Sequence, residues 1–441
     1  MKHVKYLYMP IETKERELDS KLLVALEAIS KGYVCLIGAR STYDKITKMP
    51  EGVFFHNSLG TEVNNFFKRF TRHKIVIHDE EGLIQFNWKE YITRRVDHIN
   101  FDYADIFLCW GNKQKKYIDE VKSKHLSNIE VSVVGNPRID LLQKKFRKYY
   151  DFKENNQKTI LINTKFSACN YINLRTTYLV VEEKRTEGNK ERYDFYKGYL
   201  EYCKKLFEEY KKLLHKLSYE FPKYRIILRP HPSENIQTWL NYYKNYDNIT
   251  VTRDESVGYW ISQSDVVIHT GCTTAIEAFL MDKVAISFKP IVNERYNIKL
   301  PHDISLKSFS IDECNNMVKD VLKNNFNFEK YKSNGNKFLK DYIEYSEQVN
   351  SFEQIVQSID NLDLKQHSFN WISLLKIQSL FLISKIRFFM RKDKNFNKKF
   401  KTLDYEEVSS KINSLNKILN NKVGNIQIKE LDKHSYLIWS K

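Results

Sequence analysis

The sequence has little glycine and proline, with 13 Gly and 8 Pro among its 441 residues. This scarcity excludes collagen-like chains and Gly/Pro-rich disordered chains, because both need far more of these residues. No stretch of 18 or more apolar residues occurs, so no transmembrane helix is expected. The first ten residues are mixed and charged and contain no apolar core of a secretory signal. We therefore expect a globular chain in the cytoplasm.

Cysteine pairs and nucleotide-binding fingerprints are also missing. The six cysteines are irregularly spaced and none forms a C-x-x-C pair, which disfavours a zinc site and a disulfide framework. Neither a Gly-x-Gly-x-x-Gly nor a Walker pattern occurs, which disfavours dinucleotide and P-loop sites. The sequence therefore implies no cofactor and no metal.

Positive charge is in excess, with a formal net charge of +17. A basic chain favours anionic partners such as nucleic acid, an acidic membrane surface or a phosphorylated donor. A lysine-rich solvated surface explains the same excess equally well. No RRM or zinc-finger signature is present, so a nucleic-acid-binding protein is an alternative class and no nucleic-acid partner is expected.

The length exceeds what one hydrophobic core usually serves, which predicts two domains. In the first 145 residues, β-branched and aromatic runs alternate with amphipathic stretches, as in a parallel sheet covered by helices. The predicted strands are Val4–Pro10, Tyr33–Gly38, Val53–His56, Lys74–His78, Ala104–Trp110 and Val131–Val134. The predicted helices are Glu17–Lys31, Thr61–Arg72 and Asn112–Lys124.

The same rhythm restarts at a second strand series. The predicted strands are Thr159–Thr164, Tyr224–Arg229, Ile249–Arg253, Asp265–His269 and Val284–Phe288. The predicted helices between them are Glu191–Phe221, Gln237–Tyr243, Val257–Gln263 and Thr273–Met281. We therefore predict an α/β protein with two Rossmann-like domains, residues 1–150 and 151–335, which face a ligand-binding cleft.

Residues 336–441 differ in composition and predict a helical, basic extension. Asp341–Ile359 is expected to be a helix. Trp371–Met390 is rich in Ile, Leu and Phe but contains three basic residues, and a basic run follows it. This segment is too polar to span a bilayer. It either lies on an anionic membrane with its lysines reaching the lipid phosphates, or packs as an amphipathic helix on the second domain.

A rigid turn containing a histidine follows the strand that ends at Arg229. The turn reads Arg229-Pro230-His231-Pro232-Ser233, and its two prolines fix the backbone around His231. A fixed imidazole can donate to a phosphate oxygen or move a proton, and Arg229 can neutralise phosphate. A plain strand-to-loop turn is the alternative explanation.

A second turn joins an apolar strand to an amphipathic helix in His269–Glu277. Gly271 permits a tight turn, and Thr273 or Thr274 is the expected N-cap of the helix. Helix N-termini attract anions, so the turn is a candidate phosphate site. Glu277 follows Thr274 by three residues, which also fits an ordinary capping box.

Three consecutive acids form the third motif. Asp79, Glu80 and Glu81 precede Gly82 at the end of the strand Lys74–Ile77. Like charges so close raise the pKa of at least one carboxyl, which suits a general base. A solvated polar turn is the alternative, and the sequence leaves open which acid is the base.

Together these motifs resemble those of bacterial sialyltransferases with the GT-B fold, and residues 1–335 resemble bacterial surface-carbohydrate biosynthesis proteins related to Kdo transferases. The matching residues are Glu80-Glu81-Gly82, His231-Pro232 and Thr273-Thr274. The resemblance implies that the acidic motif supplies the base for the acceptor hydroxyl. It implies that the histidine contacts the CMP phosphate and that the threonine pair binds it. The donor site would then comprise Arg229, His231, Pro232, Gly271, Thr273, Thr274 and Glu277.

The resulting hypothesis is a glycosyltransferase that moves a 2-keto acidic sugar, of the Kdo or nonulosonate type, from CMP to a glycan or lipid-linked acceptor. Stabilisation of the leaving phosphate would supply much of the catalysis. One alternative is a CDP-glycerol-type polyol-phosphate transferase, whose family also carries a His-Pro element. Another is an NDP-sugar 2-epimerase, which shares the twin-Rossmann architecture. The sequence decides neither the sugar nor an inverting or retaining outcome.

Overall fold

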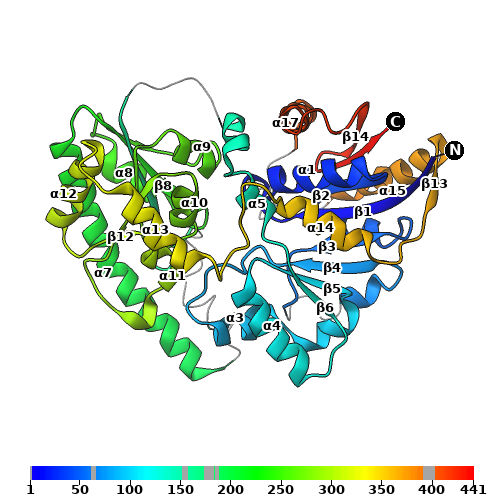
Figure 1. Cartoon of the computed structure of the whole chain (residues 1–441), viewed down its shortest axis with the longest axis horizontal. Coiled ribbons are helices and arrows are strands. Elements are labelled where there is room, and N and C mark those ends of the chain that lie inside the picture. Colours follow the sequence, from blue (N-terminus) through cyan, green and yellow to red (C-terminus); the bar gives the residue numbers. More distant parts are fainter. Residues whose placement is uncertain (1, 61–65, 151–156, 173–182, 184–187, 391–402) are drawn as a thin grey trace. The chain divides into compact units, whose positions relative to one another are not determined.

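A computed structural model describes residues 2–60, 66–150, 157–172, 183, 188–390 and 403–441, with only the backbone described for 383–390. The chain forms two compact units. Unit 1 comprises Met1–Leu83, Trp88–Tyr149 and Lys340–Lys441, and unit 2 comprises Ile84–Asn87 and Tyr150–Leu339. Each unit contains a sheet whose central strands run parallel and are covered by helices, which confirms the predicted α/β class (Figure 1).

The sheet of unit 1 has the strand order β14-β15-β2-β1-β3-β4-β5-β6, and β13 also pairs with β1. The six strands from β2 to β6 in this order run parallel. Their bounds are β1 Lys2–Ile11, β2 Tyr33–Ala39, β3 Val53–His56, β4 Lys74–His78, β5 Ile106–Cys109 and β6 Glu130–Val133. Strands β1 to β5 are nearly all buried, because helices cover both faces of the sheet.

Different helices cover the two faces of this sheet. On one face, α1 (Lys14–Ser30) packs against α14 (Ser351–Asp360) and α17 (Tyr405–Ile418) (Figure 1). On the other face, an aromatic-rich core contains residues of α4 (Asn112–Lys124) and α15 (Trp371–Met390). Further helices of this unit are α2 (Tyr43–Ile46), α3 (Trp88–Arg95) and α5 (Pro137–Asp140).

The C-terminal hundred residues contain helices, as expected, and also three strands that the sequence analysis does not anticipate. The strands are β13 (His367–Phe369), β14 (Ile426–Asp432) and β15 (Ser435–Ser440). β15 pairs antiparallel with β2, and β14 pairs with β15 as an antiparallel hairpin. This segment is therefore part of unit 1 and not a separate extension.

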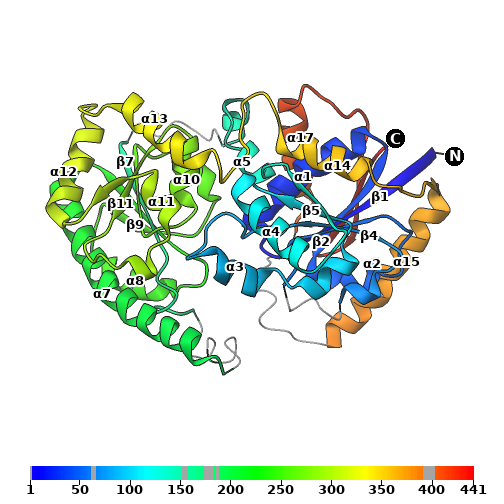
Figure 2. The same ribbon diagram turned by 60° about the horizontal axis from the view of Figure 1, so that its bottom comes forward.

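Unit 2 contains an all-parallel sheet with the order β12-β11-β10-β7-β8-β9. Figure 2 labels β7, β9 and β11 of this sheet among the helices of the unit. The strands are β7 Thr159–Thr164, β8 Arg225–Pro230, β9 Ile249–Val251, β10 Val266–His269, β11 Val284–Phe288 and β12 Leu306–Ser308. The helices are α7 Lys190–Glu220, α8 Ile236–Tyr243, α9 Val257–Ser262, α10 Thr274–Leu280, α11 Lys299–Asp303, α12 Ile311–Leu322 and α13 Phe328–Leu339.

Two predicted helices differ from the structure. Asp341–Ile359 is helical only from Ser351, since residues 340–350 form turns and irregular chain. Of Thr61–Arg72, residues 61–65 lie outside the described part, and the remainder holds a short 3₁₀ turn at Phe67–Arg69. Phe67 and Phe70 are both buried in the aromatic core. The conformation of this segment therefore follows from tertiary packing and not from helical periodicity.

Candidate functional site

Unit 2 brings the first two motifs to one edge of its sheet. His269 of β10 is in register with Asn163 of β7, and Asn163 is in register with Arg229 of β8. The carboxyl ends of these adjacent strands thus carry the predicted donor residues side by side. In open parallel sheets this edge is where ligands bind.

The turn that follows Arg229 is held by buried polar contacts. Glu234 is fully buried and accepts hydrogen bonds from the backbone N–H of His231 at 3.0 Å and from Thr164 Oγ1 at 2.9 Å. Its other oxygen accepts from Trp239 Nε1 at 2.9 Å. The Arg253 guanidinium donates to the carbonyls of Pro230, His231 and Glu234. Glu234 and Arg253 therefore fix the turn, and the sequence analysis missed both.

The His231 ring is exposed and has a defined tautomer. Its Nδ1 accepts the backbone N–H of Ser233 at 3.2 Å and lies 2.6 Å from Ser233 Oγ. An acceptor nitrogen carries no proton, so the neutral ring carries its proton on Nε2. The imidazole therefore offers an N–H donor at Nε2, the group needed to bind a phosphate oxygen.

Arg229 is held beside this turn. Its Nη2 donates to the carbonyl of Glu255 at 2.8 Å, and the side chain is partly exposed. Glu255 adopts a positive φ of 60°, so a tight turn after β9 presents this carbonyl to the guanidinium. The contact uses one of the five N–H donors of arginine, and it orients the guanidinium.

Only glycine fits at position 271, because of the backbone conformation there and because of the side chain that lies against it. Its φ is +91°, and an added Cβ would lie 2.8 Å from Nε2 of His302. Its N–H donates to Nδ1 of His269 at 2.9 Å, and Nε2 of that ring lies 2.9 Å from Ser305 Oγ. Burial lowers the pKa of His269 to about 3 and that of His302 to about 2, so both rings are neutral.

The structure places the N-cap of α10 at one of the two expected threonines, but the expected capping hydrogen bond is absent. Thr273 is the N-cap of α10, but its backbone is helical and its side chain makes no capping hydrogen bond. Thr274 Oγ1 instead lies 2.6 Å from Cys272 Sγ. Glu277 is buried in the first turn and forms no capping box with Thr274, because the helix already begins at Thr274, one residue earlier than that motif requires. Neither hydroxyl is committed to holding the end of the helix.

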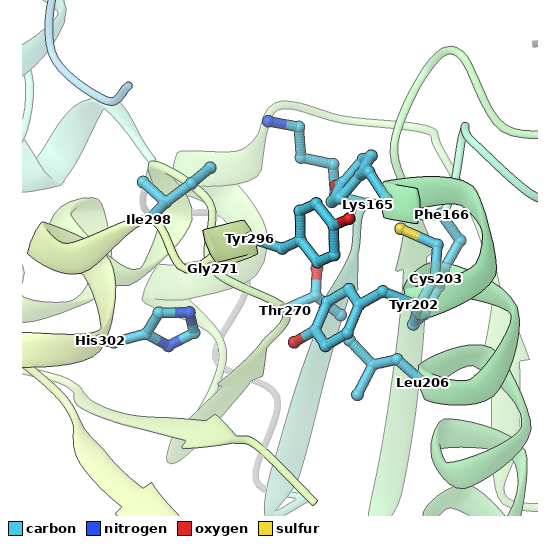
Figure 3. Close-up of a pocket in the computed structure, with 11 residues that line it drawn as sticks. Lys165, Phe166, Tyr202, Cys203, Leu206, Thr270, Gly271, Tyr296, Ile298 and His302 are labelled. Carbon is cyan, nitrogen blue, oxygen red and sulfur yellow. The ribbon is translucent and has the colours of Figure 1, made fainter. Parts of the chain in front are cut away.

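A pocket opens beside these residues at the ends of β7 and β10 (Figure 3). Lys165, Thr270 and Gly271 contribute its polar side, and the rings of Tyr202 and Tyr296 are tilted against each other with centroids 5.5 Å apart. The other lining residues are Phe166, Tyr199, Cys203, Leu206, Ile298 and His302. Lys165 directly follows a predicted strand, so its place at the strand end was available from the sequence, whereas the tyrosines come from distant segments.

Two polar groups at this edge have no hydrogen-bond partner among the described residues. They are Thr270 Oγ1, beside the pocket, and Asn163 Nδ2, on the adjacent strand. Both atoms are shielded from solvent, and Asn163 is 3% exposed. Buried polar groups normally have partners, so unsatisfied ones at a strand end suit a ligand that supplies oxygens.

Unit 1 carries the acidic motif at the end of β4, in a network of opposite charges. Asp79 is paired with Arg95, and its Oδ1 accepts the backbone N–H of Glu81 at 3.0 Å. The Glu81 side chain is 55% exposed and lies 3.5 Å from Arg16 and 3.6 Å from Arg95. Of the three acids, Glu81 is the one whose carboxylate reaches solvent.

Glu80 does not have the raised pKa that the sequence predicts for the acidic motif. Its side chain is 2% exposed, with Oε1 3.2 Å from Lys21 Nζ and Oε2 3.8 Å from Arg138. Burial alone would raise the Glu80 pKa, but the two cations outweigh it and lower the pKa to about 2. Burial instead raises the pKa of Glu17, which lies beside Glu80. At Glu80 the cations of distant elements therefore outweigh the neighbouring acids, which the sequence around the motif does not reveal.

No protein-family model matches this chain, and no curated protein matches it in sequence. Solved structures are similar to it in fold. A UDP-N-acetylglucosamine 2-epimerase aligns at 12% identity with a TM-score of 0.51, covering 84% of this chain and all of the epimerase. The Neisseria meningitidis epimerase, bound to UDP-GlcNAc, aligns at 12% identity with a TM-score of 0.49, covering 81% of this chain and 100% of that one. The wall teichoic acid polymerase TagF aligns at 11% identity with a TM-score of 0.49, covering 81% and 88%. At 12% identity the first of these likenesses, with its TM-score of 0.51, concerns the fold alone and supports a GT-B-like, two-domain α/β fold.

Proposed function

We propose that this chain is a glycosyltransferase that uses a nucleotide-activated sugar, with the nucleotide phosphate bound at the carboxyl edge of the unit 2 sheet. The observation that carries the proposal is the turn at His231, which Glu234 and Arg253 fix so that an N–H donor and the nearby Arg229 guanidinium lie at one strand end. An ordinary surface loop does not need a buried carboxylate and an arginine to fix its backbone, as Glu234 and Arg253 do for this turn.

The charge of this edge supports an anionic ligand. Lys165 follows β7, Arg229 is the last residue but one of β8 and Lys289 follows β11, so a cation lies at the carboxyl end of three of the parallel strands. Burial lowers the pKa of Lys289, which is 7% exposed, and a bound anion would offset that cost. Such a site stabilises the charge that develops on a departing phosphate.

The finer proposal is a CMP-linked 2-keto acidic sugar as donor, a glycan or lipid-linked acceptor, and an acid of residues 79–81 as the base. The sugar carboxylate and the phosphate are both anions, which suits the cationic edge. Glu81 is the better candidate for the base, because a carboxylate held ionised between Lys21 and Arg138 accepts a proton poorly. Arg138 is thereby part of the acidic network.

A donor screen tests this proposal. The purified chain is incubated with CMP-Kdo, CMP-nonulosonate, CDP-glycerol and UDP-GlcNAc, and released nucleotide and the sugar products are measured. We expect release of CMP from a CMP-sugar. Release from CDP-glycerol alone identifies a polyol-phosphate transferase, and formation of an epimer without an acceptor identifies an epimerase. Either of those results overturns the CMP-sugar assignment.

The threonine pair yields a prediction that separates binding from stability. We expect Thr273→Ala and Thr274→Ala to weaken nucleotide binding about tenfold while changing the free energy of unfolding by less than about 0.5 kcal/mol, because neither hydroxyl caps α10. Calorimetric titration with CMP and chemical denaturation measure the two quantities. Ser256→Ala is the control, since Ser256 does cap α9 and should lose about 1 kcal/mol of stability. Unchanged CMP affinity in both threonine variants would remove them from the donor site.

A further inference from the structure

Helix α15 is apolar on two opposite sides, and only one of them is covered by unit 1. Ile377 and Phe381 are buried in the aromatic core, and Leu374 and Leu380 pack against it. Lys45 Nζ lies 4.4 Å from the centre of the Phe381 ring. This side alone would produce an ordinary amphipathic helix on unit 1.

The other side of α15 exposes large apolar side chains. Trp371 is 71% exposed, Leu375 is 52% exposed and Leu382 is 61% exposed. Their spacing of four and seven residues places them on one face of the helix, and Ile372, 45% exposed, extends it. We call Trp371, Ile372, Leu375 and Leu382 the outer stripe. A contiguous stripe of this kind marks an interaction surface.

The residues around the outer stripe are basic, and this charge favours an anionic partner. The sequence of α15 contains no acidic residue, and Lys376 is exposed next to the stripe. By composition, residues 383–402 add eight Lys or Arg and one acid. A second copy of the chain would bring like charges together, which costs free energy. An anionic lipid surface complements both the basic residues and the apolar stripe, and tryptophan favours the boundary between lipid and water.

We propose that α15 docks this chain on an anionic lipid surface, with the outer stripe entering the headgroup region and Lys376 facing lipid phosphates. The inference does not depend on the proposed function. Among the described residues, no helix is long and apolar enough to cross a bilayer, so α15 would lie along the surface.

The docking is tested with point substitutions in α15 and not by removing the C-terminal segment. β14 and β15 follow α15 in the sequence and join the unit 1 sheet, so removal of the tail would damage the fold. The test variant is Trp371→Ser/Leu375→Ser/Leu382→Ser. The control variant is Leu126→Ser/Tyr219→Ser/Val292→Ser, which removes large hydrophobic side chains that are 89%, 79% and 59% exposed elsewhere on the chain. Circular dichroism and thermal unfolding confirm that both variants fold.

The measurement is sedimentation with vesicles of phosphatidylcholine, with and without phosphatidylglycerol. We expect the full chain and the control variant to bind the phosphatidylglycerol vesicles in a salt-sensitive manner. We expect the test variant to bind about tenfold more weakly or worse. The proposal is overturned if the full chain binds neither vesicle, or if the test variant binds as well as the full chain. A dimer that the same substitutions dissociate, without vesicle binding, would assign the stripe to a second copy.

Discussion

Replacing His231 with alanine is expected to lower turnover by about 100-fold or more. The substitution removes the Nε2–H donor that Ser233 and the fixed turn orient, and hence the stabilisation of the leaving phosphate. The ring is exposed, so the fold should be unaffected. The rate constant at saturating donor, followed by nucleotide release, measures the effect.

Two companion variants separate this role from a general effect of losing a histidine. His215→Ala removes an exposed histidine of α7 that contacts Tyr246, and it should leave turnover unchanged. Ser233→Ala keeps the backbone N–H that sets the tautomer and should retain most of the activity. Near-normal turnover of His231→Ala at saturating donor would show that the leaving group is stabilised by other residues.

The acidic motif gives the second large effect, and Glu80 and Glu81 should behave in opposite ways. Glu80→Gln leaves Lys21, whose side chain is 3% exposed, buried without its carboxylate partner. We expect the free energy of unfolding to fall by about 3 kcal/mol. Glu81→Gln alters a side chain that is 55% exposed, so stability should change by less than about 0.5 kcal/mol while transfer is abolished.

Acid titration provides an independent measurement on Glu80. Because its pKa falls from an ordinary value of 4.5 to about 2 on folding, its ionised form stabilises the folded state above about pH 4.5. That stabilisation is lost as the pH falls from there toward 2, and Glu80→Gln should lack this part of the acid dependence. Donor binding should survive in the Glu81→Gln variant. If both variants transfer sugar normally, the base is not in this motif.

The positions of most strands follow from local sequence. β3, β4, β7 and β11 begin and end at the predicted residues, because each is a short β-branched or aromatic run with turn residues on both sides. β14 was missed because it is a partly exposed edge strand, and β15 because its burial depends on pairing with β2, which lies about 400 residues earlier. Long-range pairing of this kind leaves no local pattern.

The site residues that lie at the ends of strands could be predicted from the sequence. The residues whose burial or charge depends on distant elements could not. Arg229, His231 and Gly271 lie at strand ends, as the alternation of strands and helices indicates. Glu234 is different, since its burial depends on Thr164 and Trp239. The charge state of Glu80 likewise depends on Lys21 of α1, which the local sequence around the acids does not reveal.

The place of β15 in the sheet also sets an order for folding during synthesis. Except for Ile84–Asn87, unit 2 is one continuous stretch that ends at Leu339, whereas unit 1 needs β15, which begins at Ser435. At ribosomal rates of about 5–20 residues per second, β15 is made roughly 5–20 seconds after unit 2. Until then the β2 edge lacks its antiparallel neighbour and can pair with other chains. The nascent protein would therefore finish its later-starting unit first and depend on chaperones to shield the earlier one.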